Sequence, residues 1–528
     1  MQATYNKYTN NIEYGSTSAA AWSAPSDWID ISSVGSNEIN LLVKEGSGIA
    51  FTVTTAGTFS INWGDGSVVN GLTSGIHQHQ HTTGGTPCSL GYNTWKIRIY
   101  GASSDITAFR ISKHAYTLNT QQPPVLSAVL NVPGVTDYSY CFASPAYDFY
   151  CRYLLACDIR SFRDAATTSY MFSGCTAFAS VTLPVSWGSN ATTAYMFNNC
   201  ACLRSVTLPA SFGSVLTTTY MFDYCYALTA VSGLTSWGSN LNASYMFDRC
   251  SALTSVSLPT AWGSVTNVAG MFYNNSILPS LTLPSSWGMV QIANAMFINC
   301  QALDSILLPV SWGSLTNANN MFQQCASLSA IALPSSWGNL SLVSGMFQNC
   351  YKLASFTLPS SWGSLTNTSW MFASCYSLSA ITLPVSLGSS LSNAASMFNS
   401  CYNLKTINNY AFAGSNLVQA NLTDFVKDCD FLQIAISNGS LLSNFGLGST
   451  TTNKSKINSV RLTNPGSLFV GNYPEIDVSY SDLSAAALNL LFGDLPALSG
   501  KTIKITGTTG AASCTRTIAT AKGWAVSG

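Results

Sequence analysis

The chain has 528 residues, a formal net charge of +0 at pH 7, and only 8% charged residues. A chain of this length is too long for one hydrophobic core, so we expect several units. The balanced charge argues against a nucleic-acid partner, because binding to phosphates requires a surplus of basic residues. No apolar run reaches the roughly 18 residues that a membrane-spanning helix needs, so we expect no membrane insertion.

Residues 1–38 are rich in polar and aromatic residues, and we interpret them as an N-terminal docking arm. One interpretation is a strand and loop that pack on the following domain, and the other is an arm that docks onto an assembly. The first residues lack the basic start and apolar run of a signal peptide, so we expect no export signal.

Residues 39–120 have the pattern of a β-sandwich. Four β-branched or aromatic runs are bounded by glycine and serine, as is typical of short strands: Ile39–Val43, Ala50–Thr54, Thr58–Trp63 and Trp95–Tyr100. The motif Trp63-Gly-Asp-Gly66 resembles the hairpin of polycystic-kidney-disease-type immunoglobulin-like domains. This resemblance implies an immunoglobulin-like fold, although an Asp-Gly pair is also a common hairpin turn.

Three histidines alternate along a candidate strand, at His77, His79 and His81. Alternate residues of a strand share one face, and histidine is the commonest metal ligand, so the pattern predicts a metal site. Trimeric phage spike and fibre tips are similar in their use of His-x-His strands around an axial iron. The alternative is a polar edge strand without a metal. No organic cofactor is expected.

Residues 121–169 are interpreted as a transition and N-terminal cap. The segment Gln121-Gln-Pro-Pro124 interrupts regular structure. A degenerate repeat start at Tyr140-Cys-Phe142 indicates that this region shields the open end of the array that follows.

A 25-residue period dominates residues 170–410. A Met-Phe pair recurs at this spacing, with one last step of 26, at Met171, Met196, Met221, Met246, Met271, Met296, Met321, Met346, Met371 and Met397. Such a period is the signature of a solenoid. In each unit a Leu-x-x-Val/Ile-x-Leu run indicates a strand, a proline ends it, and a loop with a short helical turn is expected before Met-Phe. The predicted fold class is therefore a mixed α/β repeat protein, a leucine-rich-repeat solenoid with a parallel β-sheet, preceded by an immunoglobulin-like β-sandwich.

Nine cysteines occupy one repeat position, four residues after the methionine: Cys175, Cys200, Cys225, Cys250, Cys300, Cys325, Cys350, Cys375 and Cys401. Equivalent positions of a solenoid stack about 4.8 Å apart with parallel side chains, which does not suit the crossed geometry of a disulfide. Free cysteine packs as a small hydrophobe, so we expect a buried ladder of reduced thiols. Reduced thiols indicate folding in a reducing compartment.

The whole unit, Met-Phe-x-x-Cys-x-x-Leu-x-x-Ile-x-Leu-Pro-x-Ser-Trp-Gly, resembles the BspA-like leucine-rich repeats of bacterial surface proteins and phage-encoded relatives. The resemblance covers residues 170–410 and implies a role in adhesion. Two flanking stretches, Pro25–Ile31 and Gly507–Trp524, resemble the ends of repeat proteins found in phage virions.

Residues 411–528 are predicted to form irregular leucine-rich repeats and a C-terminal cap. Strand patterns occur at Ile457–Leu462, Glu475–Ser479 and Lys501–Ile505. The segment Ser481–Leu495 has the pattern of a capped amphipathic helix, and Ile518–Val526 predicts a further helix and strand.

Ligand binding is expected where the copies differ, close to the Met-Phe pair. The candidate residues there are aromatic or charged: Tyr195, Tyr220, Asp223, Tyr224, Tyr245, Asp248, Arg249 and Tyr273. Stacked aromatic rings beside acids and arginine would suit a sugar ligand, and ordinary solvent-facing variation is the alternative. The sequence lacks the common catalytic motifs, so we expect no enzyme. A polysaccharide-cleaving tailspike that uses Asp223 and Asp248 is a further alternative.

These patterns predict a non-enzymatic structural protein of a bacteriophage virion: a fibre, an appendage or a head decoration. It would assemble in the host cytoplasm as a homo-oligomer and contact other virion proteins through its N-terminal region. The solenoid would serve adhesion or host recognition through a surface glycan or protein. The alternative is a BspA-like adhesin of the bacterial cell surface.

Overall fold

The computed structural model describes residues 3–6, 11–14, 26, 28–45, 48–81, 84–89, 91–112, 123–143, 151–335, 337, 339–359, 364–384, 390–408, 425–426, 429, 433–436, 459–462 and 475–528. The chain divides into two compact units, Met1–Val265 and Thr266–Gly528, and each is described by itself. Residues 411–424, the start of the predicted irregular repeats, lie outside the described residues.

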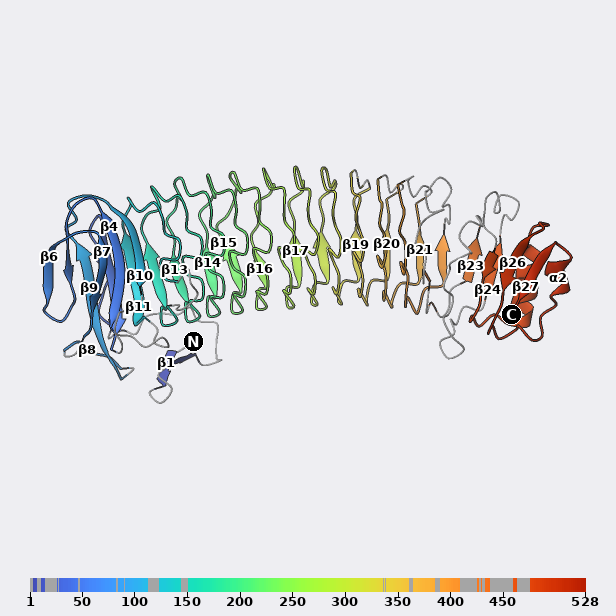
Figure 1. Cartoon of the computed structure of the whole chain (residues 1–528), viewed down its shortest axis with the longest axis horizontal. Coiled ribbons are helices and arrows are strands. Elements are labelled where there is room, and N and C mark those ends of the chain that lie inside the picture. Colours follow the sequence, from blue (N-terminus) through green and yellow to red (C-terminus); the bar gives the residue numbers. More distant parts are fainter. Residues whose placement is uncertain are drawn as a thin grey trace. The chain divides into compact units, whose positions relative to one another are not determined.

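The first unit begins with antiparallel sheets (Figure 1). A two-stranded sheet pairs β1 (Ala3–Asn6) with β2 (Asn11–Tyr14), and a three-stranded sheet has the order β10 (Ile106–Ser112), β4 (Ile49–Thr55), β7 (Gly75–His79). The largest sheet has the order β13 (Ser180–Thr182), β12 (Ala156–Ile159), β11 (Val125–Asn131), β3 (Glu38–Lys44), β9 (Asn93–Tyr100), β5 (Phe59–Asn62), β6 (Val68–Leu72), and β8 (Thr86–Pro87) also pairs with β9. The strands predicted from residue 39 to residue 100 are thus confirmed.

Strand β11 joins this region to the repeats. It runs antiparallel to β3 on one side and parallel to β12 on the other. The large sheet therefore continues into the first coils and does not end as a separate sandwich. The rings of Phe51 in β4 and Trp63 after β5 lie 5.5 Å apart, so the two sheets share a core. An immunoglobulin-like topology is not shown by this arrangement.

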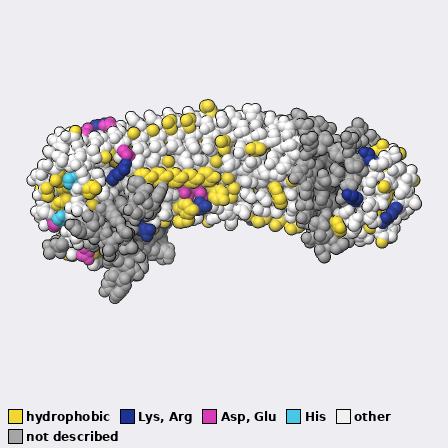
Figure 2. Space-filling model, viewed as in Figure 1, with side chains coloured by type: hydrophobic (Ala, Val, Ile, Leu, Met, Phe, Trp, Pro, Cys, Tyr) yellow, Lys and Arg dark blue, Asp and Glu magenta, His cyan; other side chains and the backbone are white. Residues whose placement is uncertain are grey.

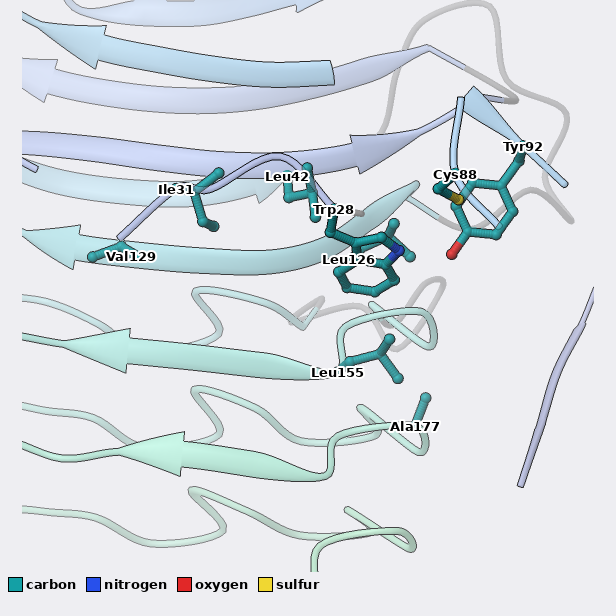
Figure 3. Packing of buried hydrophobic residues seen from close by; sticks show 9 residues of the cluster. All are labelled: Trp28, Ile31, Leu42, Cys88, Tyr92, Leu126, Val129, Leu155 and Ala177. Carbon is teal, nitrogen blue, oxygen red and sulfur yellow. The ribbon is translucent and has the colours of Figure 1, made fainter. Parts of the chain in front are cut away.

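A buried cluster holds the N-terminal segment on the large sheet (Figure 3). Trp28 and Ile31 pack in it together with side chains from β3, the segment between β8 and β9, β11 and the first coils: Leu42, Cys88, Tyr92, Leu126, Val129, Leu155 and Ala177. The amide of Asn40 donates to the carbonyl of Ile31 at 3.1 Å. For this segment the packing agrees with the first interpretation, a loop on the following domain. Docking of the preceding residues onto an assembly stays a prediction.

Parallel coils follow, each one repeat long. In the first unit β14 (Ser205–Thr207), β15 (Ala230–Ser232) and β16 (Ser255–Val256) pair in register. In the second unit the parallel pairs are β17 (Ser280–Thr282) with β18 (Ser305–Leu307), β19 (Ala330–Ala332) with β20 (Ser355–Thr357), β21 (Ala380–Thr382) with β22 (Thr406–Asn408), and β23 (Gln433–Ile436) with β24 (Ser459–Leu462). A second ladder of single-residue bridges, such as Thr192 with Thr217, ties the return side of neighbouring coils together.

The predicted mixed α/β class is wrong, because the structure is a β-solenoid of stacked parallel coils. Helix is confined, among the described residues, to α1 (Ala485–Asp494) and α2 (Thr517–Thr520). The expected helical turn before Met-Phe is absent from the described coils, where Tyr195, the residue directly before Met196, has φ 58°. A helix of L-residues cannot continue through this left-handed conformation. The backbone there bonds to the next coil instead, as from the Tyr195 N–H to the Thr219 carbonyl at 3.0 Å.

The fixed residues of the repeat fill the core, as predicted. Phe172, Phe197 and Phe222 are fully buried, and their rings stack with centroids 5.4 and 5.2 Å apart. In the second unit the rings of Phe297 and Phe322 stack at 5.4 Å. Each coil thus covers the aromatic face of its neighbour.

The nine repeat cysteines are buried and free, which confirms the predicted thiol ladder. Each thiol lies close to a phenylalanine carbonyl of the preceding coil, as between Cys325 Sγ and the Phe297 carbonyl at 3.2 Å. Burial raises the pKa of the Cys350 thiol and of its ladder neighbours. Cys429 continues the ladder with a contact of 3.1 Å to the Phe398 carbonyl, although the period is lost in the sequence there.

The C-terminal end of the second unit is a small sheet with two helices. Strands β25 (Glu475–Asp477), β26 (Lys501–Lys504) and β27 (Trp524–Ser527) are parallel. Helix α1 begins at the N-cap Ser484, whose hydroxyl accepts a hydrogen bond from the Ala487 N–H, so the predicted capped helix is confirmed. Among the residues that the structure describes, no helix has both the length and the apolar character required to cross a membrane.

Candidate functional site

A tight turn at one corner of the coil positions the predicted binding residues. The Asp223 N–H donates to the Tyr220 carbonyl at 3.2 Å, and Tyr220 has φ 55°. The next coil repeats the turn, with the Asp248 N–H donating to the Tyr245 carbonyl at 3.1 Å. The tyrosine and the aspartate of each coil therefore emerge from the same corner, one at each end of a four-residue turn.

Tyrosine rings form a ladder along this corner. Tyr140, Tyr170, Tyr195, Tyr220 and Tyr245 stack successively, with centroids 4.8, 4.6, 4.9 and 4.8 Å apart and nearly parallel planes. Figure 2 shows a row of hydrophobic side chains along the visible face, beside a small group of acidic and basic ones. Because neighbouring rings cover each other's faces, the ladder offers ring edges and hydroxyl groups to a ligand. A sugar ring cannot lie flat between stacked neighbours, so the predicted sugar ligand would have to approach the ladder from its exposed edge.

Two carboxyl groups lie beside the ladder and are almost fully buried. Asp223 is 5% exposed and Asp248 is 3% exposed. Arg249 Nη1 lies 2.8 Å from Asp248 Oδ2 and 3.9 Å from Asp223 Oδ1. The amide of Asn198 donates to Asp223 Oδ2 at 3.1 Å. Within the described structure, the Oδ1 atom of each aspartate is buried without a hydrogen-bond partner.

Burial raises the pKa of ionisable groups at this corner of the coil. It raises the pKa of Asp223 to about 7, and the neighbouring Asp248 carboxylate adds to the effect while Arg249 opposes it. Burial likewise raises the pKa of Asp248 to about 6, against the opposing charge of Arg249. It also raises the pKa of Tyr220 to about 12, together with the adjacent Tyr195 and Tyr245. Near neutral pH the Asp223 carboxyl group can therefore donate as well as accept a hydrogen bond.

An aromatic platform holds the arginine in place. The Arg249 guanidinium lies over the ring of Tyr224, 4.6 Å from its centroid. The Tyr224 ring in turn meets the edge of Tyr226, which is exposed, at 5.8 Å. This cation–π contact orients the guanidinium toward both carboxylates.

The structure brings seven of the eight predicted binding residues together in the first unit. We call this group the acid–tyrosine patch: Tyr195, Tyr220, Asp223, Tyr224, Tyr245, Asp248 and Arg249. Tyr273, the eighth, belongs to the second unit and is half-buried. Sequence reasoning missed Tyr226, which no repeat position marks, and placed Tyr140 in the cap outside the ladder. The 25-residue spacing of the later tyrosines, counted backwards from Tyr170, does not reach Tyr140, because the step there is 30 residues.

The three predicted histidines do not share one environment. His79 Nε2 lies 2.6 Å from Asp65 Oδ2, and His81 Nε2 lies 2.7 Å from the Trp63 carbonyl. His77 instead lies 3.1 Å from the Thr73 carbonyl, with its ring edge against Phe59. The structure thus groups His79 and His81 with Asp65.

The pKa values of Asp65 and His81 are both lowered, for different reasons. Burial would raise the pKa of Asp65, but hydrogen bonds from Ser67 and His79 outweigh it and lower the pKa well below its usual range. Burial lowers the pKa of His81, against the opposing hydrogen bond to the Trp63 carbonyl.

Comparison with known families decides the kind of repeat. The model of the BspA type leucine rich repeat region matches residues 146–229, 242–370 and 316–434, which together make up more than half of the chain. The chain belongs to the BspA-type leucine-rich repeat family. The matched residues of this BspA-type protein include every member of the acid–tyrosine patch.

The other comparisons add little. No curated protein matches this BspA-type chain. Among solved structures, a leucine-rich repeat protein from Eubacterium ventriosum ATCC 27560 is similar at 17% identity, over 56% of this chain and 92% of that one, with a TM-score of 0.27. The resemblances of the two flanks to phage virion proteins are not shown by these comparisons.

Proposed function

We propose that this BspA-type protein is a non-enzymatic adhesin of the bacterial-surface kind, whose acid–tyrosine patch binds a glycan. The family supports a binding role, and the earlier alternative of a bacterial adhesin fits it better than a virion role, which the comparisons do not support. One observation carries the choice of site: two buried carboxyl groups, each with an unpartnered oxygen, lie beside a ladder of tyrosine hydroxyls.

The patch is chemically unusual for this chain. Between Ala166 and Leu404 the charged residues are few: Arg204, Asp223, Asp248, Arg249, Asp304 and Lys352. Three of these six meet at one corner of two adjacent coils. A buried carboxyl oxygen without a hydrogen-bond partner is costly for the fold, so two of them at one corner indicate a use other than stability.

Sugar hydroxyls suit the polar groups of this corner. A sugar hydroxyl can bond with the half-buried tyrosine side chains along the ladder, and the half-buried Arg249, which the two carboxyl groups hold in place, can donate to a sugar oxygen. The coils repeat these groups at the spacing of the stacked rings, 4.6 to 4.9 Å. An extended glycan could therefore bond to several coils at once, which adds affinity without any single strong contact.

The same geometry argues against glycoside cleavage. A glycosidase places its two carboxyl groups on opposite sides of the scissile bond. Asp223 and Asp248 lie side by side on neighbouring coils and share one guanidinium. We therefore propose binding without hydrolysis.

A glycan array with the purified protein tests the proposal. We expect the protein to bind a polysaccharide. The affinity should fall by at least about tenfold in the Asp223→Asn/Asp248→Asn double variant, because neither amide supplies the charged acceptor that Arg249 has in the natural protein. Asp304→Asn is the matched control, since Asp304 is an exposed aspartate of the array in the other unit. Unchanged binding in the double variant would refute the site, and release of reducing sugar would refute the non-enzymatic role.

A further inference from the structure

A second cluster of polar side chains lies in the N-terminal region, apart from the acid–tyrosine patch. Asp65 lies in the turn between β5 and β6, and His79 ends the strand β7 of the other sheet. His81 follows two residues later. One potential ligand atom from each of these three residues lies within 4.8 Å of the other two.

Tryptophan rings hold both imidazoles in position. The His79 ring stacks on Trp63 with centroids 4.8 Å apart and planes 17° apart. The His81 ring stacks on Trp95 with centroids 4.6 Å apart and planes 28° apart. Both tryptophans are almost fully buried, at 4% and 3% exposed, so the imidazoles rest on rigid walls.

Hydrogen bonds to the other atoms of these groups fix their orientation. The Ser67 N–H donates to Asp65 Oδ1 at 3.0 Å, and the Ser67 hydroxyl bonds the same oxygen, which leaves Oδ2 toward His79. His81 Nε2 can donate to the Trp63 carbonyl at 2.7 Å, and the lone pair of its Nδ1 then remains for a ligand. Metal-binding histidines typically donate their second ring N–H to a carbonyl or carboxylate in this way.

We propose that Asp65, His79 and His81 bind one divalent transition-metal ion of the zinc type per chain. Two imidazoles and one carboxylate are the donor set that Zn²⁺ accepts with a water or another ligand in the fourth position. This inference is independent of the proposed glycan binding, because it concerns other residues of the chain. It also differs from the sequence prediction, because Asp65 replaces His77 as the third ligand.

The ion takes the place of a proton. In the structure His79 and Asp65 share a hydrogen bond of 2.6 Å. Ligand atoms of a tetrahedral zinc ion lie roughly 3.4 Å apart, given bonds of about 2.0–2.1 Å. The pair must therefore open by somewhat less than 1 Å. Asp65 lies between Gly64 and Gly66, both at positive φ, in an exposed turn that can make this adjustment.

Metal binding would join the two sheets of the region. Asp65 belongs to the edge of the large sheet and His79 to the three-stranded sheet. An ion bound only by the folded form adds its binding free energy to the stability of that form. We expect the thermal transition of the first unit to rise by several degrees with excess Zn²⁺.

Isothermal titration of the metal-stripped protein with Zn²⁺, repeated with Co²⁺, tests the site. We expect one ion per chain and a Co²⁺ absorption spectrum typical of four-coordinate N,O ligands. Asp65→Asn and His79→Asn should each weaken Zn²⁺ binding by about 100-fold or more, since loss of even an outer-shell partner costs 10–100-fold.

His77→Asn is the matched control, because His77 lies on the same strand and outside the cluster. It should leave the affinity for Zn²⁺ within about twofold. The proposal is overturned if Zn²⁺ does not bind at micromolar concentration. It is also overturned if His77→Asn abolishes binding while Asp65→Asn does not, or if one ion binds per three chains, as a His-x-His site around an axis would require. Circular dichroism of each variant separates loss of ligand from loss of fold.

Discussion

At the scale of single residues, the stacking of coils changes the pKa values of the acid–tyrosine patch. Asp223 and Asp248 occupy the same position of consecutive copies, and burial raises the pKa of both. Protonation therefore favours the folded state, because the folded protein binds the Asp223 proton more tightly than the unfolded chain does.

The first prediction concerns the pH dependence of stability. The stabilising effect of this proton is complete below the unfolded pKa of about 4 and is lost as the pH rises through about 7, the folded pKa of Asp223. Asp223→Asn should remove this dependence, so the variant should match the natural protein at pH 4 and exceed its stability by on the order of 2 kcal/mol at pH 8. Urea unfolding followed across this range measures the difference. A variant that is less stable at pH 8 would contradict the assigned shift.

The second prediction concerns the thiol ladder. Cys325→Ala removes the contact with the Phe297 carbonyl and leaves a small cavity in a fully buried site. We expect a loss of about 1–3 kcal/mol in the free energy of unfolding. Cys202→Ala is the control, because Cys202 is only partly buried and lies outside the ladder, and its cost should be smaller. Equal costs at the two positions would argue against a special role of the ladder thiols.

At the scale of one element, the corner of the coil depends on left-handed backbone. Gln324 is exposed and has φ 62°, whereas the adjacent Gln323 is not among the residues with positive φ. For most L-residues this conformation raises the free energy of the folded state by about 1–2 kcal/mol, and the cost is largest for β-branched residues.

The third prediction uses this neighbouring pair. Gln324→Val should cost about 1–2 kcal/mol, while Gln324→Gly should be neutral or stabilising, because glycine adopts positive φ without strain. Gln323→Gly should instead destabilise by about 0.5–1 kcal/mol through chain entropy. Chemical denaturation of the three variants measures these differences, and the reverse order for the two glycine variants would refute the role of the backbone.

The coil also explains which parts of the fold could be predicted. Leu328 and Ile331 show the strand through their spacing, and Pro334 shows where it ends. The helical turn expected before Met321 is wrong, because the polar residues of that stretch do not show the sign of their φ angles. The left-handed backbone at Asn320 and Gln324 excludes a helix, and the side chains of these two residues do not require that conformation.

One candidate site could be predicted from the sequence, and the other could not. Asp223 and Asp248 are neighbours because the repeat length is constant, so their approach could be predicted from counting. Asp65 and His79 meet because the turn after β5 approaches β7 of the other sheet. No spacing in the sequence indicates that contact, which depends on how two sheets pack.

At the scale of the whole molecule, cysteine burial is nearly complete. Of the 16 cysteines, Cys202 and Cys514 alone are partly exposed in the structure, and all 16 are free. The fourth prediction is that a thiol reagent such as DTNB labels about two groups in the folded protein and all 16 after unfolding. Rapid labelling of many thiols in the folded protein would show that the coils open more readily than their packing indicates.

The coil-to-coil bonding has a consequence for how such a chain can change in length. Within each unit, described coils bond their backbone to the next one, as where the Phe297 N–H donates to the Met321 carbonyl at 2.8 Å. Stability is then close to a sum over neighbouring pairs, and no single coil is indispensable. Gene duplication or loss of one whole period would preserve every ladder, whereas a change of a few residues would shift all the stacked side chains at once. Evolution of the repeats is therefore expected to proceed in whole coils, with the array growing by one period at a time.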